Sequence, residues 1–282
     1  MNREPLRFLI VVAHPHDFTH GAATVGMHVD KGASATVVAV TDGIQAHNEK
    51  LEDEMKKPPE LRDSDIVNQT VEQYAAEKTR ELQEACALFG IGDVRSLGYP
   101  MPFRKERYRQ AIEDIKQLIL ELRPHILITH SPYGKRARGH IDLNADDHTE
   151  VGLAVQEAYA YAGVTDPAKT QVNPPHRVAM ILYPGVYFDK ADVDFVVDIG
   201  EAGYERRMRA EEIFLSQGHT PAYARRTIEL ITGNLGWFSH VCYAEGWVRD
   251  RIEVHDEIPI SDYTLRMATE PYSDLIRRMI PE

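Results

Sequence analysis

The stretch RFLIVVAHPHDFTHGAATVGMHVDKGASATVVAV, residues 7–40, contains the pattern that decides the fold. Residues 7–12 form an apolar run, which is typical of a strand buried on both faces in a parallel sheet. A helix is predicted over residues 21–32, and a second apolar run follows at residues 35–40. Strand, helix and strand in this order predict a βαβ unit with a right-handed crossover.

The same alternation continues through the first half of the chain. It predicts a helix at 66–90, a strand at 93–99, a helix at 109–123 and a strand at 125–130. Residues 41–65 are polar and are interrupted by Pro58 and Pro59, so we expect a long surface loop there. The fold class predicted is α/β, a Rossmann-like, doubly wound and mostly parallel sheet with helices on both faces.

The second half of the chain has a less regular pattern. A long loop is predicted at residues 131–147, and after residue 247 no period is clear. Between them we expect helices and strands, namely a helix at 146–163, strands at 177–184 and 194–200, and helices at 204–217 and 222–234. We therefore expect residues 1–282 to form one domain with a less regular C-terminal extension.

Composition limits the classes of partner. The 282 residues include 32 Lys and Arg against 44 Asp and Glu, a formal net charge of −12, which argues against binding to nucleic acid or to an anionic membrane. A small-molecule substrate is expected, and a homo-oligomer is compatible with the sequence. With no signal peptide and no apolar stretch approaching the roughly 20 residues that span a bilayer, we expect a cytoplasmic protein.

Histidines and a carboxylate gather where the predicted strands end. His14 and Asp17 follow the first strand, and His148 stands at the start of the helix after the fourth strand. Ligands of open α/β sheets bind outside the carboxyl ends of the strands. Two imidazoles, one carboxylate and an open fourth position are the pattern of a catalytic zinc, and Asp147 is a candidate to orient a ligand from outside. Cys86 and Cys242 match no zinc spacing, so Zn²⁺ would be held by His and carboxylate.

Some of these residues have simpler explanations. Capping the helix that begins near His20 could be the sole role of Asp17. Asp146 and Asp147 could be ordinary carboxylates of a first helical turn. For Asp146 we prefer that explanation. We expect surface or packing positions for the histidines without matching neighbours, which are His20, His28, His125, His176, His219 and His255.

The motifs resemble those of a known family. AHPHD at 13–17 resembles the signature AHPDD of the LmbE-like, or PIG-L, zinc-dependent N-acetylglucosamine deacetylases, and DDH at 146–148 resembles the end of their signature HPDH. The stretches at 78–100 and 208–217 are similar to further family segments, with Lys78 where Arg is usual. The resemblance implies the same fold, implies His14, Asp17 and His148 as the zinc ligands, and makes Lys78 a candidate for substrate binding.

Two positions depart from the family pattern. His16 stands where the family has the aspartate that acts as general base, and a neutral imidazole can also act as a base near pH 7. Ala145 stands where the family has a histidine that supports the tetrahedral intermediate. His130 and His140 are the candidates to replace that histidine, and His47 is a further candidate for the base.

A second branch of the superfamily is also similar. The zinc-containing 4-oxalomesaconate hydratases have AHSADF, close to AHPHDF here, and a YAEG that is matched at 243–246; THSPYG at 129–134 is similar to their SHS after strand four. They place a glutamate base in the loop after strand two, where this chain has His47 and, two residues later, Glu49.

These observations lead to three hypotheses. The first is a zinc hydrolase that cleaves an N-acyl or related amide bond with water activated by the metal and His16 as base. The second is a zinc hydratase acting on an unsaturated carboxylate, with candidate binders Arg104, Lys135, Arg136 and Arg138. The basic stretch KRAR favours it, although a solvated loop face explains that stretch equally well. The third is a binding protein without catalysis; we prefer the first.

Overall fold

A computed structural model describes residues 4–45, 48–133, 146–165 and 173–281, and the backbone alone at 135–136 and 140–141. Seven of the described strands form one sheet in the order β3-β2-β1-β4-β7-β9-β8. The first five in this order pair in parallel, whereas β9 is antiparallel to both neighbours. The bounds are β1 Arg7–Val12, β2 Ser34–Thr41, β3 Asp93–Tyr99, β4 Ile126–Thr129, β7 Met180–Pro184, β8 Phe195–Asp198 and β9 Ala244–Arg249.

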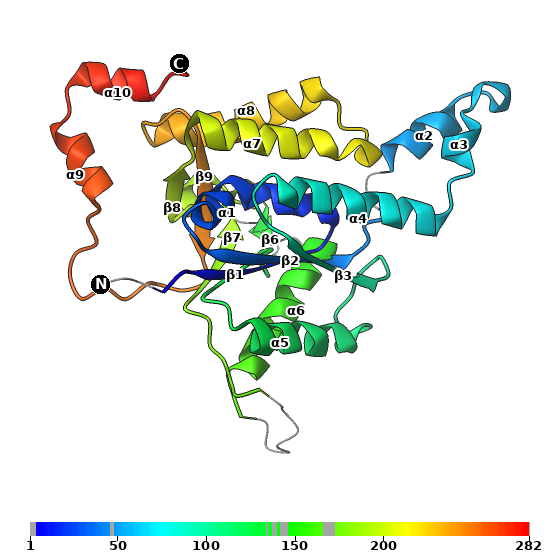
Figure 1. Ribbon diagram of the computed structural model, residues 1–282, viewed down its shortest axis with the longest axis horizontal. Helices are drawn as coiled ribbons and strands as arrows, with labels where there is room; N and C mark the ends of the chain where they lie inside the picture. The colour runs from blue at the N-terminus through cyan, green and yellow to red at the C-terminus, as the bar shows by residue number, and fades with distance from the viewer. Residues whose placement is uncertain are drawn as a thin grey trace.

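Helices cover both faces of this sheet, as Figure 1 shows. One face carries α1 (Ala22–Val29), α4 (Val71–Ala87) and α7 (Gly200–Ile213), and α8 (Pro221–Phe238) packs on α7. The other face carries α5 (Arg109–Leu122) and α6 (Asp147–Ala162). The predicted α/β class, with a mostly parallel sheet between two helical layers, is confirmed.

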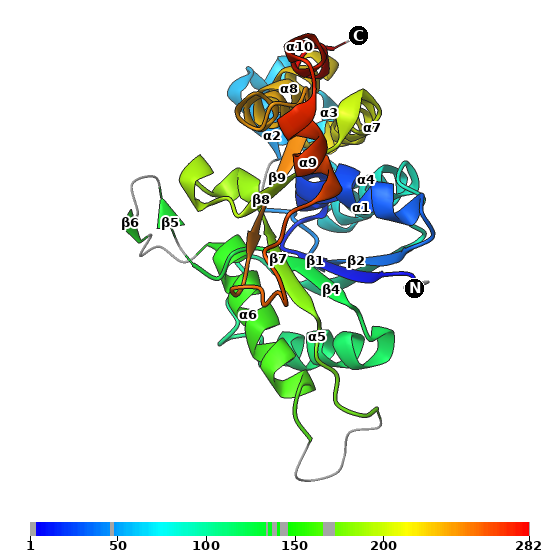
Figure 2. The same ribbon diagram turned by 90° about the vertical axis from the view of Figure 1, so that its left-hand side faces the viewer.

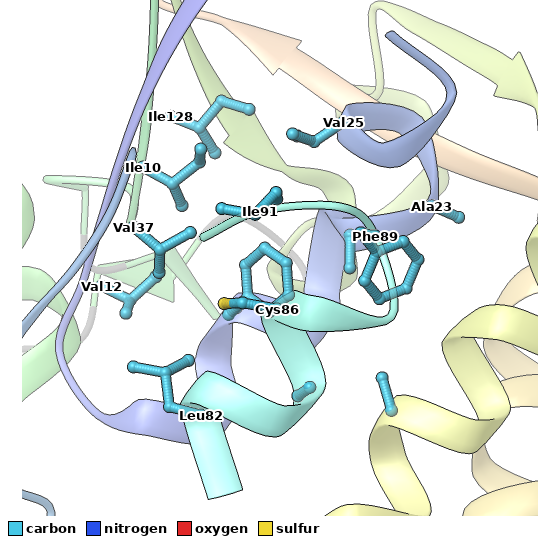
Figure 3. Packing of buried hydrophobic residues seen from close by; sticks show 14 of the residues in the cluster. Ile10, Val12, Ala23, Val25, Val37, Leu82, Cys86, Phe89, Ile91 and Ile128 are labelled. Carbon is cyan, nitrogen blue, oxygen red and sulfur yellow. The ribbon is translucent and has the colours of Figure 1, made fainter. Parts of the chain in front are cut away.

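The apolar run of β1 builds both halves of the core. Ile10 and Val12 face α1 and α4, and Figure 3 shows them next to Val37 on the sheet side of the cluster. Leu9 and the other alternate residues face α5 and α6 instead. Because a buried Leu, Ile or Val side chain contributes roughly 1.5–3 kcal/mol, a strand that is buried on both faces anchors the fold strongly.

The expected loop at 41–65 is wrong in part. It contains α2 (Glu49–Lys56), the 3-10 turn η2 (Pro59–Leu61) and α3 (Ser64–Val67). The side chain of Asn48 caps α2 by accepting from the backbone N–H of Leu51 at 3.4 Å. Only Glu54 of α2 is buried, so this helix has no apolar stripe that the sequence could reveal. The helix expected at 66–90 begins later, at Val71.

The chain after residue 247 is more ordered than expected. β9 continues to Arg249, and two helices follow, α9 (Asp262–Thr269) and α10 (Tyr272–Arg278), the second of which lies near α8 in both views. The hydroxyl of Tyr263 donates to Asp198 at 3.1 Å, which ties α9 to β8. Neither α9 nor α10 buries a residue, so no core periodicity marked them in the sequence.

Two further features complete the described part of the chain. The short strands β5 (Lys135–Arg136) and β6 (His140–Ile141) pair with each other and stand apart from the main sheet in Figure 2. None of the helices that the structure describes is both long and apolar enough to cross a lipid bilayer.

Candidate active site

The candidate site is built where β1 and β4 end. After β1 the chain enters the 3-10 helix η1 (Pro15–Gly21), with His14 as its N-cap and Asp17 inside it. His148 is the second residue of α6. A Cβ added to Gly152 would lie 2.6 Å from the carbonyl oxygen of His130, so only glycine lets α6 pack so closely against the end of β4. This close packing brings His148 over the end of β1.

Four imidazoles, those of His14, His16, His130 and His148, surround the carboxylate of Asp17. Its Oδ2 lies 3.5 Å from His14 Nδ1, and its Oδ1 lies 3.4 Å from His148 Nε2 and 3.2 Å from His16 Nε2. Asp17 is only 2% exposed, so these interactions are little screened by water. The backbone N–H of His14 also donates to Oδ2 at 2.8 Å, which fixes the carboxylate at the start of η1.

The polar atoms at the centre of this group lack hydrogen bonds. His14 Nδ1, Asp17 Oδ1 and His148 Nε2 are buried and have no hydrogen-bond partner among the described residues. Buried polar side-chain atoms are normally paired, so atoms left in this way call for a ligand. Two imidazole nitrogens and one carboxylate oxygen are donors that zinc accepts. The residues present therefore fit a metal ion.

More than one set of residues has the spacing for a metal. The donor atoms of His14, His16 and Asp17 lie within 4.8 Å of one another, and so do those of Asp17, His130 and His148. The expected ligands His14, Asp17 and His148 take members from both sets. Asp17 is common to all of these combinations.

Asp17 and the imidazoles around it shift one another's pKa values. Burial alone would raise the pKa of Asp17, but the imidazoles of His16, His130 and His148 outweigh it and hold that pKa well below its usual range. Burial alone would lower the pKa of His148, but Asp17 and Asp146 outweigh it and raise the pKa to about 10. The charge that holds protons on these imidazoles would also attract a divalent cation.

Asp147 connects His14 to the neighbouring segment. Its Oδ2 lies 3.4 Å from His14 Nε2, and its Oδ1 accepts from the backbone N–H of Phe103 at 3.0 Å. Arg104, an expected substrate binder, places Nη1 3.1 Å from the same Oδ1. Asp147 thus contacts the side of His14 that faces away from Asp17, whereas Asp146 caps α6 by accepting from Thr149, as expected.

His130 lies beneath Asp17. Its Nε2 accepts from the backbone N–H of Ala13 at 2.9 Å and lies 3.2 Å from Asp17 Oδ2. Burial lowers the pKa of His130, and the residue is 3% exposed. In this position it links the ends of β1 and β4.

Of the expected site residues not yet placed, the structure describes the side chain of Lys78. Lys78 is fully buried in α4, with Nζ 5.1 Å from the ring centroid of Tyr74, and burial lowers its pKa to about 8. The remaining expected residues cannot be placed in the site, because His47, Arg138 and the side chains of Lys135, Arg136 and His140 lie outside the described part of the chain.

A pocket of about 370 Å³ opens beside His16. His20 and His219, for which surface or packing positions were expected, line it. Burial alone would raise the pKa of Glu211, but His219, whose Nδ1 lies 3.1 Å from its Oε1, outweighs it and lowers the pKa to about 2. The remaining lining residues are Glu49, Gln217, Gly218, Tyr223 and Thr227.

Two polar side chains of the site were missed in the sequence. Gln217 lines the pocket at 1% exposure, and neither amide atom has a hydrogen-bond partner among the described residues. Its place in the family-like stretch 208–217 was a signal that could have identified it. Tyr187, in the turn η4 (Gly185–Tyr187), lies with its ring centroid 5.7 Å from those of His130 and His148. No motif or ligand spacing marks Tyr187.

Glu245 of the YAEG stretch has a structural role. Both carboxylate oxygens of Glu245 accept backbone N–H groups at the start of α1, from Ala23 at 3.2 Å and from Thr24 at 2.8 Å. Arg207 donates to the same carboxylate at 3.1 Å, and both side chains are buried. Glu245 therefore caps α1 and does not face the pocket.

Comparison with known proteins shows the family of the chain. Residues 9–159 match the family model described as PIG-L, GlcNAc-PI de-N-acetylase. A 1D-myo-inositol 2-acetamido-2-deoxy-alpha-D-glucopyranoside deacetylase from Catenulispora acidiphila is 27% identical over 200 residues, which are 64% of this chain and 60% of that protein. The match thus spans less than two thirds of that relative's length.

Solved structures share the fold. The 4-carboxy-2-hydroxymuconate hydratase from Pseudomonas putida superposes with a TM-score of 0.69 at 17% identity, covering 90% of this chain and 100% of that one. The N,N'-diacetylchitobiose deacetylase from Pyrococcus horikoshii has a TM-score of 0.66 at 19% identity, covering 95% of this chain and 88% of that one. At these identities the likeness shows the fold alone.

Proposed function

The chain belongs to the PIG-L, or GlcNAc-PI de-N-acetylase, family, and from this premise we propose that it is a zinc-dependent hydrolase. It cleaves an N-acyl bond, such as an acetamide, of a small molecule. The observation that carries the proposal is the set of buried atoms without hydrogen bonds, His14 Nδ1, Asp17 Oδ1 and His148 Nε2. They are the ligands that we assign to the metal.

The residues of the site have distinct roles in this reaction. When bound, Zn²⁺ supplies Lewis acidity, which activates water and polarises a carbonyl group. We assign the role of base to His16, whose ring lies beside the proposed ligand Asp17, with 3.2 Å between Nε2 and Oδ1. Asp147 orients His14 through Nε2, as carboxylates commonly orient the histidines that bind metals.

The pocket beside His16 supports a neutral substrate. Glu211 is ionised there, and no lysine or arginine is found among the described residues that line the pocket. A hydroxyl or amide group of a neutral substrate can pair with the amide of Gln217. The amine released by deacetylation is cationic at neutral pH and would be attracted to Glu211.

A hydratase remains the second candidate because of Glu49. This residue begins α2 and lines the pocket together with His16, close in sequence to where the resemblance places the glutamate base of the hydratases. The YAEG match does not favour this candidate, since Glu245 caps α1. The two candidate functions thus differ in which side chain acts as the base.

A substrate screen with two variants tests the proposal. Metal-loaded parent protein, His16→Ala and Glu49→Gln are assayed for acetate release from N-acetylglucosaminides and for hydration of unsaturated dicarboxylates. We expect acetate release by the parent, its loss in His16→Ala and its retention in Glu49→Gln, with equal metal content in all three. Hydration that Glu49→Gln abolishes, without any acetate release, would replace the hydrolase by the hydratase.

A further inference from the structure

Tyr187 reaches the candidate site from a strand that supplies none of the proposed metal ligands. η4 follows the carboxyl end of β7, which pairs with β4 in the sheet. A Cβ added to Gly185 would lie 2.8 Å from the backbone of Gly246, so glycine allows the chain to turn tightly past β9. This turn carries the Tyr187 ring to the rings of His130 and His148, at 5.7 Å between centroids.

The hydroxyl of Tyr187 is held by His20, a residue that lines the pocket. Its oxygen lies 2.8 Å from His20 Nδ1, and the two rings are nearly perpendicular, with centroids 5.0 Å apart. The ring of His20 in turn lies 6.1 Å from that of His16, and both histidines line the pocket. Tyr187 therefore spans the distance between the proposed ligand His148 and the proposed base His16.

The side chain of Tyr187 is also partly exposed. It is 37% exposed, in contrast to His130, which is 3% exposed and bonded to the backbone of Ala13. Of the two side chains, only Tyr187 has a donor hydroxyl that a bound substrate could contact. A phenol can accept one hydrogen bond and donate another at the same time.

Amide hydrolysis needs such a donor. When the water oxygen bonds to the carbonyl carbon, the π electron pair moves onto the carbonyl oxygen, which becomes negative. A hydrogen-bond donor aimed at that oxygen typically contributes about 10²–10³-fold to kcat. The family histidine that supports this intermediate is replaced here by Ala145. The role is therefore open to another side chain.

We propose that Tyr187 is a catalytic residue whose hydroxyl donates a hydrogen bond to the developing oxyanion, and that His20 is the residue that positions this hydroxyl. His20 carries hydrogen on Nδ1 and donates it to the phenol oxygen, so that the phenolic hydrogen points to the substrate. No proton is transferred in this step. The inference rests on the proposed hydrolase function.

The test compares variants in acetate release from N-acetylglucosamine or N,N'-diacetylchitobiose. Tyr187→Phe keeps the ring and removes only the hydroxyl, so we expect kcat to fall about 10²-fold with little change in KM or metal content. Tyr161→Phe is the control, because the Tyr161 hydroxyl bonds to Glu157 on α6 and the residue is exposed. It should behave like the parent.

A double-mutant cycle tests the positioning role. His20→Ala should lower kcat in the parent but add little to Tyr187→Phe, and His20→Asn, which retains a donor near Nδ1, should recover part of the loss. Tyr187→Phe with kcat within about twofold of the parent would overturn the inference while leaving the hydrolase intact, as would a loss of kcat that follows metal loss. A parent that hydrolyses no amide would defeat both proposals.

Discussion

The two ends of the parallel sheet hold their histidines in different ways. At the amino ends, His125 precedes β4 and accepts the backbone N–H of Arg7 at Nδ1, at 3.2 Å. His176 precedes β7 and places Nε2 2.7 Å from the carbonyl oxygen of Pro124. Both histidines therefore use ring nitrogens to connect neighbouring segments of the fold.

At the carboxyl ends, two histidines have ring nitrogens that make no hydrogen bond to another described residue. His14 Nδ1 and His148 Nε2 are buried and have no hydrogen-bond partner among the described residues. Both nitrogens lie beside Asp17, at 3.5 and 3.4 Å from its oxygens, where a bound metal ion would supply the missing partner. The difference between the two ends teaches that hydrogen bonding, and not residue type, separates binding histidines from structural ones.

Removing Asp17 should have the largest effect at the carboxyl end. Asp17 contacts both proposed histidine ligands, so Asp17→Ala should abolish metal binding, whereas the parent should retain about one zinc ion per chain. Elemental analysis after gentle purification measures this. Asp114→Ala is the control, because Asp114 lies on α5, away from the site, and its carboxylate accepts a hydrogen bond from the Tyr99 hydroxyl. Full metal occupancy in Asp17→Ala would refute the ligand assignment.

Removing His16 should separate catalysis from metal binding. Without its proposed base, His16→Ala should lose about 10²–10⁴-fold in kcat and keep its metal. In the parent, acidification should also reduce activity, since a protonated imidazole has no lone pair with which to accept a proton. His28→Ala is the control, because His28 packs on Phe8 away from the site. Near-full turnover by His16→Ala would move the base to another residue.

Changing Asp147 should weaken the metal without removing it. Asp147→Asn keeps the shape of the side chain but removes the negative charge beside His14 Nε2, so metal affinity should fall about 10–100-fold. Competition with a chelator of known affinity measures the change. Glu150→Gln, one turn further along α6, changes a carboxylate that accepts from Lys105 and should leave the affinity unchanged. Equal affinities for both variants would contradict the orienting role.

The sequence predicts the features that depend on local pattern. The apolar run at 7–12 predicted the central strand β1, and the spacing of His14, Asp17 and His148 predicted candidate ligands whose side chains do lie together. α2 was missed because it buries only Glu54, so its polar sequence resembles a loop. Asn48 at its start was the remaining local signal.

The parts of the site that were missed depend on tertiary contacts. Tyr187 comes from the turn after β7, and its neighbours His20 and His148 lie far from it in the chain. Gln217 and His219 reach the pocket because α7 and α8 pack side by side over the sheet. No single stretch of sequence contains these pairs, so local pattern could not reveal them.

The smallest effect is expected at the amino end of the sheet. His125→Ala removes the acceptor of the Arg7 N–H, and because the His125 side chain is partly exposed, water can replace part of the lost bond. The free energy of unfolding should therefore fall by only about 1 kcal/mol. A denaturant titration measures this change, and metal content should equal that of the parent.

His14→Ala, matched to His125→Ala, compares one histidine from each end of the sheet directly. Metal that binds only the folded protein raises its stability, so a chelator should lower the Tm of the parent and of His125→Ala by the same amount. It should have no such effect on His14→Ala, which lacks a proposed ligand. If the chelator shifts His14→Ala as much as His125→Ala, then His14 does not hold the metal. The two ends of the sheet would then not differ in the way that their hydrogen bonds indicate.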